Sequence, residues 1–267
     1  MSLKKDNGRR AVAMEIELPD TPQQVWQAIA TGPGFSAWFT RTEIEEREGG
    51  AVAFHLGEGM TSRGQVTVWR PSKLLVFEEA NWSGEAPPLA TEITVEAQAG
   101  GICKVRMVHS LFTEKDDWDK ELGSMENGWP PFFVVLRIYL KSFAGQRAAS
   151  ASIKGSYDGP HDAAWEAVQA ALGLAGATIG DTRDTSASGV PRAVGDIVDR
   201  SATAHQRAVT MRLSEPPGVA IIGTYEWGGR VHVSVSLYFY GADADALAAR
   251  ETPAWEGWMQ RHFKQEA

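Results

Sequence analysis

The chain has 267 residues, 43% hydrophobic and 22% charged, which is the balance of a folded globular protein with room for two domains. The formal net charge of −8 at pH 7 argues against nucleic acid as a partner, because phosphate binding needs a basic surface. A single cysteine, Cys103, excludes an intrachain disulfide and a cysteine-rich metal site. No apolar run has the length of a signal-peptide core or a membrane span, so we expect a cytoplasmic protein without membrane insertion.

The N-terminal region predicts an arm, a strand and two helices. Residues 1–12 carry two basic pairs and are expected to form a flexible arm. From Ala13 to Leu18 apolar and acidic residues alternate, which is typical of a half-buried strand. Asp20-Thr21-Pro22 then supplies a cap and a proline suited to the first turn of a helix. A short second helical turn is expected at Phe35–Phe39.

The next stretch predicts an antiparallel meander. Short apolar-rich runs are separated by glycine and proline pairs that favour turns. Alternation of apolar and polar residues in the last two runs indicates that one face of the sheet contacts water. The expected strands are Ala51–Leu56, Gly64–Trp69, Leu74–Ala80, Thr91–Ala97 and Ile102–Ser110.

The most apolar stretch of the chain is Gly128–Phe143, which follows a helical pattern over Glu114–Met125. Pro130 and Pro131 fit the first turn of a helix, where a missing N–H costs nothing, so a new helix is predicted to start there. Its residues are apolar on nearly all sides. Such a helix must be covered by a sheet, a ligand or both.

After a small, polar linker at residues 145–152, the pattern starts again. A strand over Ala151–Tyr157 precedes a helix with Trp165, at nearly the offset from a proline that Trp26 has in the first half. Residues 178–191 are rich in Gly, Ser, Thr and Asp and predict a mobile loop. Four strands are then expected, the last two joined by a Gly-Gly hairpin turn: Val194–Arg200, His205–Leu213, Val219–Trp227 and Arg230–Tyr240.

The chain closes with two predicted helical segments, Ala242–Ala249 and Pro253–Phe263. Within the second, Gly257-Trp258 repeats the Gly128-Trp129 pair of the first half. Repeated landmarks in the same order indicate an internal duplication. The second copy lacks the long apolar stretch, so its closing helix should be shorter and more polar, with a smaller pocket or none.

Six motifs of the first half occur in a characteristic order: Thr21–Ile29, Phe35–Phe39, Gly64-Gln65-Val66, Pro71–Phe77, Val105–Ser110 and the Gly128-Trp129 helix. Together they resemble the activator-of-Hsp90-ATPase-like branch of the START-like (SRPBCC, helix-grip) superfamily, over about Met14 to Phe143. In the second half the resemblance rests on Trp165 and Gly257-Trp258 alone. It implies a cavity between a sheet and a long helix, in which many members hold apolar small molecules. Other members are co-chaperone domains or cyclase-like enzymes.

We therefore predict an α+β protein with two tandem helix-grip (START/Bet v 1-like) modules. Each module is expected to be a curved antiparallel sheet wrapped around a C-terminal helix. The first should span residues 13–145 and the divergent second 151–267.

Nine residues of the first module are candidates for binding a ligand in this cavity, and ordinary core packing is the alternative for the apolar ones. His109 is either a polar handle in the pocket or a structural histidine bonded to a backbone carbonyl. Arg137 either pairs inward with Glu78 or Glu79, or with a ligand carboxylate, or lies on a solvated helix face. The nine are Trp38, Phe39, Trp69, Trp82, His109, Trp129, Phe133, Leu136 and Arg137.

No catalytic residue, cofactor or metal site is predicted. The chain lacks a phosphate-binding loop and a nucleophile elbow, and its six histidines are scattered singly. The leading hypothesis is non-catalytic binding of a small hydrophobic or aromatic molecule. One alternative is a co-chaperone-like or other interaction module with a protein partner or as a homodimer. Another is a cyclase- or hydrolase-like enzyme that uses His109 with a nearby carboxylate.

Overall fold

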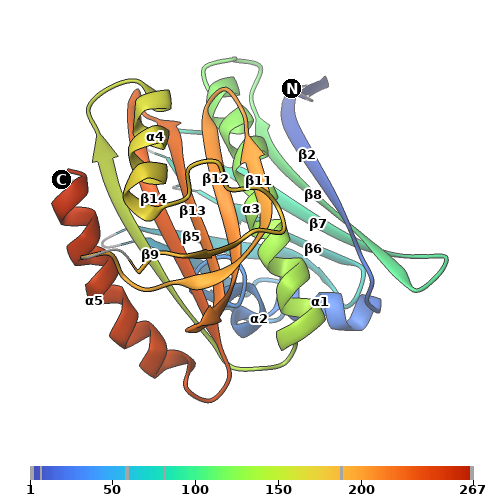
Figure 1. The fold of residues 1–267 in the computed structure, drawn as a ribbon. Coiled ribbons are helices and arrows are strands. Elements are labelled where there is room, and N and C mark those ends of the chain that lie inside the picture. The colour runs from blue at the N-terminus through green and yellow to red at the C-terminus, as the bar shows by residue number, and fades with distance from the viewer. Residues whose placement is uncertain are drawn as a thin grey trace. The chain divides into compact units, whose positions relative to one another are not determined.

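The computed structural model describes residues 3–6, 8–57, 60–80, 82–83, 85–186 and 189–264 (Figure 1). Its backbone divides into two compact units, Met1–Trp129 with Tyr139–Gly145, and Pro130–Ile138 with Gln146–Ala267. Each unit holds one antiparallel sheet and its helices, so the expected α+β fold with two tandem modules is confirmed. The boundaries proposed for the modules, 13–145 and 151–267, stay a prediction.

The sheet of the first unit has eight strands in the order β1-β2-β8-β7-β6-β5-β4-β3. Strands β4 to β8 correspond to the five predicted runs, while the three-residue strands β1 and β3 were not predicted. The strands are β1 (Lys4–Asp6), β2 (Arg9–Leu18), β3 (Thr42–Ile44), β4 (Ala51–Gly57), β5 (Met60–Arg70), β6 (Leu74–Glu79), β7 (Leu89–Gln98) and β8 (Ile102–Phe112).

The prediction of a flexible arm through residue 12 is wrong for residues 9–12. These residues already belong to β2 and pair with β8. Val12 is fully buried, and the buried Arg10 guanidinium forms an ion pair with Asp119. The arginine therefore ties the strand to the rest of the unit instead of marking a solvated tail.

Two short helices follow β2, as expected: α1 (Pro22–Ala30) and α2 (Gly32–Ser36). Thr21 and Gln24 form a capping box, in which the Gln24 N–H donates to Thr21 Oγ1 and the Thr21 N–H to Gln24 Oε1. Gly34 lets α2 turn tightly after α1, because a Cβ there would lie 1.9 Å from the Gln27 carbonyl oxygen. These local signals place α1 correctly. The second helix, expected at Phe35–Phe39, starts earlier, because the Thr31 hydroxyl caps it by accepting from the Gly34 N–H at 3.0 Å.

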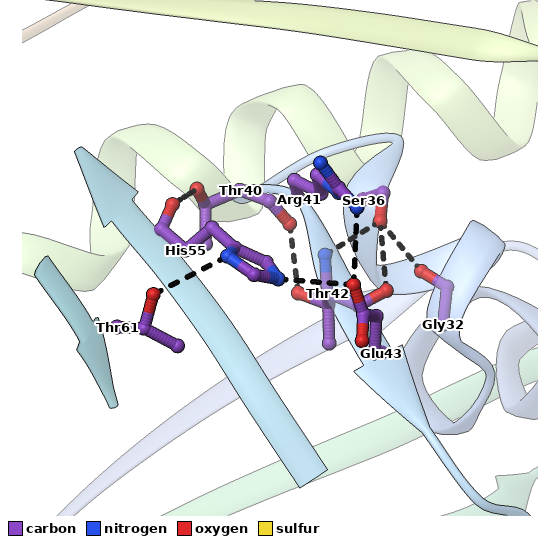
Figure 2. A network of polar contacts seen from close by, with 8 residues as sticks. All are labelled: Gly32, Ser36, Thr40, Arg41, Thr42, Glu43, His55 and Thr61. Atoms are coloured by element: carbon purple, nitrogen blue, oxygen red, sulfur yellow. Dashed lines mark hydrogen bonds and ion pairs between the residues drawn. The ribbon is translucent and has the colours of Figure 1, made fainter. Parts of the chain in front are cut away.

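A polar network fixes the edge strand β3 to α2 and β4 (Figure 2). The Ser36 hydroxyl donates to the Gly32 carbonyl at 2.7 Å and accepts from the Thr42 N–H at 2.8 Å. Thr40, two residues before β3, donates its hydroxyl hydrogen bond to the carbonyl of His55 on β4. Hydroxyl side chains thus hold a strand of only three residues in place.

The long helix α3 (Asp119–Phe143) is continuous, with Pro130 and Pro131 inside it. The predicted helix start at this pair is therefore wrong. An interior proline costs about 3 kcal/mol because it removes a helical hydrogen bond and crowds the preceding turn. Apolar burial on both sides offsets this cost, since Leu122 packs with Val12, Leu89 and Leu111 and the later Leu136 is fully buried.

The second unit repeats the topology, with strand order β10-β11-β12-β13-β14-β9. In both sheets the first long strand pairs with the last, and the others follow as a meander. Helix α5 packs on β9 and β14, and α4 packs on β13 and β14 (Figure 1). The elements are β9 (Ala148–Tyr157), α4 (His161–Leu172), β10 (Thr182–Asp184), β11 (Val194–Ala202), β12 (Gln206–Glu215), β13 (Pro217–Trp227), β14 (Arg230–Tyr240) and α5 (Ala244–His262).

Two expectations for the second unit need correction, and two are confirmed. The segment predicted as a mobile loop contains β10 and the buried Thr185, whose hydroxyl donates to the Pro191 carbonyl at 2.6 Å; its residues 187–188 lie outside the described part. The two predicted C-terminal helices are one helix, α5, with Pro253 inside it. As expected, α5 is shorter than α3, and a Gly228-Gly229 turn with positive φ joins β13 to β14.

No helix in the described part of the chain is long and apolar enough to cross a membrane.

Candidate functional site

Four polar side chains lie on the inner face of the first sheet, one on each of the adjacent strands β5, β6, β7 and β8. We call Ser62, Glu79, Thr91 and His109 the polar row; each is at most 7% exposed. Thr91 pairs directly with His109, while Glu79 lies two positions along β6 from Phe77, the partner of Thr91. Because alternate strand residues share a face, these polar groups point to the same side as the apolar core.

His109 is held at both ring nitrogens. Nδ1 lies 2.9 Å from Thr91 Oγ1, and the Trp129 indole N–H donates to Nε2 at 2.7 Å. An indole nitrogen can only donate, so Nε2 must be the acceptor and the proton must be on Nδ1, which donates to Thr91. The two bonds fix one neutral tautomer of the ring.

Burial lowers the pKa of His109 to about 4. Protonation would also place a second N–H against the indole N–H, where an acceptor is needed. The histidine is therefore neutral at physiological pH, and neither ring nitrogen is free to take a proton from a substrate. This geometry does not fit the general base that the enzyme hypothesis requires.

Glu79 is a buried carboxyl without a cationic partner. The Ser62 hydroxyl donates to Glu79 Oε1, and it is the one hydrogen-bond partner of this carboxyl among the described residues. Burial raises the pKa of Glu79, and the Ser62 hydrogen bond opposes this only in part. Burial thus shifts this carboxyl toward its neutral acid form, next to a histidine that is neutral.

An aromatic cluster adjoins the row at Trp129. The Trp129 ring lies 4.6 Å from Phe39 and 6.0 Å from Trp38, measured between centroids. Trp38 is fully buried and is fixed by its own N–H, which donates to the Ala28 carbonyl at 2.9 Å. Trp129 therefore joins the aromatic side chains of the turn after α2 to the polar row on the sheet.

Four of the nine predicted site residues come together here: Trp38, Phe39, His109 and Trp129. Trp69 packs instead against Trp26 of α1, with centroids 5.2 Å apart. Trp82 packs against Trp118 and donates its N–H to the Pro87 carbonyl, as part of a separate core cluster with Val12 and Leu111.

The remaining three, Phe133, Leu136 and Arg137, lie in the part of α3 that groups with the second unit. Phe133 and Leu136 are buried, whereas Arg137 is exposed. The expected pair between Arg137 and Glu78 or Glu79 stays a prediction. Burial raises the pKa of Asp199 in the second unit, and the positive charge of Arg137 opposes that increase. Ligand contact by these three residues stays a prediction.

Sequence reasoning missed Ser62 and Thr91 and considered Glu79 only as a partner for Arg137. One available signal was alternation, since Leu75, Phe77 and Glu79 share a face and the first two are plainly apolar. A carboxyl that continues the alternation of two buried apolar residues on the same strand face is itself expected to be buried. Ser62 gave no comparable signal because the predicted strand began only at Gly64.

The two sheets can be aligned by their registers. The last residue of β2, Leu18, pairs with Cys103 on β8, and His109 lies six residues after Cys103. In the second sheet the last residue of β9, Tyr157, pairs with Val231 on β14, and Leu237 lies six residues after Val231. Leu237 therefore occupies the position of His109.

The other members of the row follow from this alignment. The register partner of Leu237 is Ala220, which takes the place of Thr91, and Leu213 takes the place of Glu79. Gly64 and Gly195 then correspond, and a Cβ on either would lie 2.2 Å from a carbonyl oxygen of the next strand. Two residues before them lie Ser62 and Ala193. All four counterparts belong to the apolar core of the second unit: Ala193, Leu213, Ala220 and Leu237.

A second histidine, His55, lies on the outer face and forms part of the network in Figure 2. Its Nε2 is 3.1 Å from Glu43 Oε1 and its Nδ1 is 3.3 Å from Thr61 Oγ1. The hydrogen bond from His55 is the main cause that lowers the pKa of Glu43, which also pairs with Arg41. These residues lie on neighbouring strands at an exposed sheet edge, so cross-strand pairing explains their contacts.

No group of three or more His, Cys, Asp or Glu side chains that could hold a metal occurs among the residues that the structure describes.

In a comparison with known families, residues 20–141 match the model described as "Activator of Hsp90 ATPase homolog 1-like protein". No curated protein matches the chain. Among solved structures, MLL2253 from Mesorhizobium loti is 22% identical over 49% of this chain and 97% of its own, with a TM-score of 0.45.

Two further structures show how much the covered share of this chain varies among similar structures. DynU16, a protein of the dynemicin biosynthetic locus, is 17% identical over 93% of this chain and 94% of its own, with a TM-score of 0.42. The Aha1 dimer from Colwellia psychrerythraea is 21% identical over 49% of this chain and 96% of its own, with a TM-score of 0.41.

Proposed function

Residues 20–141 belong to the activator of Hsp90 ATPase homologue 1-like family of START-like domains, and we propose that this domain binds a small hydrophobic or aromatic molecule without transforming it. The fold supports a ligand-binding or interaction module in general. The proposal places the ligand on the inner face of the first sheet, beside the polar row and Trp129.

The observation that supports this proposal is the polar row itself. Buried polar groups cost free energy, and a sheet packed only for stability places apolar residues at such positions. The second sheet does so at all four, with Ala193, Leu213, Ala220 and Leu237. The fold therefore does not require the polar row, and a recognition role explains why the first sheet has one.

The chemistry of the row favours binding over catalysis. His109 has both nitrogens engaged, and its lowered pKa keeps it neutral. The Trp38, Phe39 and Trp129 rings pack at tilted angles next to these polar groups and supply aromatic side chains beside them. Sites for small apolar ligands commonly combine aromatic surface with a few fixed polar groups.

The test is native mass spectrometry of the purified protein, followed by denaturation and identification of any released molecule. We expect one hydrophobic or aromatic molecule per chain. Trp129→Phe removes the hydrogen bond to His109 and should lower the occupancy severalfold. Trp258→Phe in the second unit is the matched control and should leave the occupancy unchanged. An empty wild-type protein that also fails to take up hydrophobic fluorescent probes would contradict the proposal and leave the interaction module as the alternative.

A further inference from the structure

The carboxyl of Glu79 has a property that the rest of the polar row lacks. One of its oxygens, Oε1, accepts from the Ser62 hydroxyl, and no described residue bonds the other. His109, by contrast, is bonded at both nitrogens. This second oxygen is not among the fully buried polar atoms, so it is accessible to a partner although the side chain as a whole is only 7% exposed.

The surroundings of Glu79 favour the neutral acid. The residues beside it on β6, Glu78, and beside Ser62 on β5, Arg63, are exposed on the opposite face of the sheet. On the same face, His109 is neutral, and the guanidinium of Arg10 on β2 is already paired with Asp119. With no cation bonded to its carboxyl, burial raises the pKa of Glu79 and so favours the protonated form.

A protonated carboxyl with Oε1 already accepting has its O–H as the free group. That O–H is a hydrogen-bond donor, so its complement on a ligand is an acceptor oxygen. Phe77 lies two residues before Glu79 on the same face, and its ring centroid is 5.4 Å from that of Phe54. The donor is therefore adjacent to an aromatic surface.

Resting on the proposed function, we infer that Glu79 donates a hydrogen bond to a carbonyl oxygen of the bound molecule, and that the ligand class is neutral aromatic carbonyl compounds. Carboxylate ligands are disfavoured, because the described residues of β5 to β8 place no cation on this face and Arg10 of β2 is already paired with Asp119. The sequence-based idea that Arg137 holds a ligand carboxylate is replaced by a neutral donor.

The experiment compares two fluorescent probes: prodan, a neutral aromatic ketone, and its analogue with a methylene in place of the carbonyl. The affinity of prodan relative to the analogue is measured for each protein. Glu79→Leu, which copies Leu213 of the second sheet, should lower this ratio about tenfold, the value of one hydrogen bond. Glu79→Gln keeps an N–H donor and should change the ratio by less than about threefold.

Glu78→Gln, on the outer face of the same strand, is the control and should leave the ratio unchanged. The infrared carbonyl stretch of prodan bound to the wild-type protein gives a reading that needs no folded variant. We expect it at the lower frequency of a hydrogen-bonded ketone.

A free-ketone frequency in the wild type, or an unchanged ratio in Glu79→Leu, overturns the inference while leaving the proposed function standing. If neither probe binds the wild type, both are overturned.

Discussion

Two tryptophans that follow a glycine, Trp129 on α3 and Trp258 on α5, show how the two modules differ. Trp129 is half-buried and donates its N–H to His109 at 2.7 Å. Trp258 is fully buried in the second core, and its N–H has no partner among the described residues. The second sheet has Leu237 at the position of His109, and a leucine offers no acceptor.

This difference shows that the repeated tryptophan serves packing in both modules but hydrogen bonding only in the first. A buried N–H without a partner costs about 1–3 kcal/mol, so the second module tolerates a defect that the first avoids. The polar row is thus a feature of one module and not of the fold. The comparison can be tested by substituting a residue in one module at a time and comparing it with the matching residue of the other module.

The largest expected effect is the acid sensitivity that His109 gives to the first module. Its pKa falls from 6.5 to about 4 on folding, so the unfolded chain takes up a proton first. The stability that depends on the neutral ring is present above about pH 6.5 and is lost as the pH falls to about 4. The total is about 3 kcal/mol.

Urea unfolding of wild type and His109→Leu across this pH range measures the loss. The difference in unfolding free energy between the two proteins should shift in favour of the variant by about 3 kcal/mol at the acid end. Leu237→Ala, at the matching position in the second sheet, should show no such pH-dependent difference. A pH-independent difference for His109→Leu would show that folding does not change the pKa of the histidine, and would contradict its assignment as a buried neutral ring.

The next effect concerns the two tryptophans. Trp129→Phe should lower the free energy of unfolding by about 2 kcal/mol, since it loses a hydrogen bond and leaves His109 Nε2 without a donor. Trp258→Phe should cost about 1 kcal/mol or less, because removal of an unpaired N–H offsets the lost ring volume. Equal losses in chemical denaturation would contradict the assigned difference.

A smaller effect is expected at two buried threonines. Thr91→Val removes the hydroxyl that accepts from His109 and should cost about 1 kcal/mol. Thr210 is fully buried on β12, and its hydroxyl has no partner in the described structure. Thr210→Val should therefore be neutral or stabilising in thermal unfolding. A loss for Thr210→Val as large as for Thr91→Val would show that both hydroxyls are bonded.

The smallest effect is expected on the outer face, where His55 and Glu43 pair in solvent. Glu43→Gln should lower the stability only slightly, because exposed ion pairs are weak. Salt at about 1 M shortens the Debye length to about 3 Å and should remove what difference there is. Persistence of the difference at high salt would indicate that the network has a structural role beyond its charges.

The sequence by itself determined the features that depend on local chemistry. Thr21 with Pro22 marked the start of α1, and Gly228-Gly229 marked the last hairpin. Apolar runs bounded by glycine and proline turns placed strands β4 to β8 and β11 to β14. The family resemblance over the first half was confirmed by the match at residues 20–141. These features depend on residues that are close in the sequence, so they can be predicted without knowledge of the tertiary structure.

The tertiary structure decided the features that depend on residues far apart in sequence. Pro130 and Pro131 look like a helix start, but buried contacts on both sides keep α3 continuous through them. His109 was one candidate among several until Thr91 and Trp129, 18 and 20 residues away, were seen to hold its two nitrogens. Glu79 became significant only when burial, and the absence of a cation among the described residues near it, favoured its neutral form. Long-range packing sets desolvation and hydrogen-bond partners, and these determine the chemistry of a side chain.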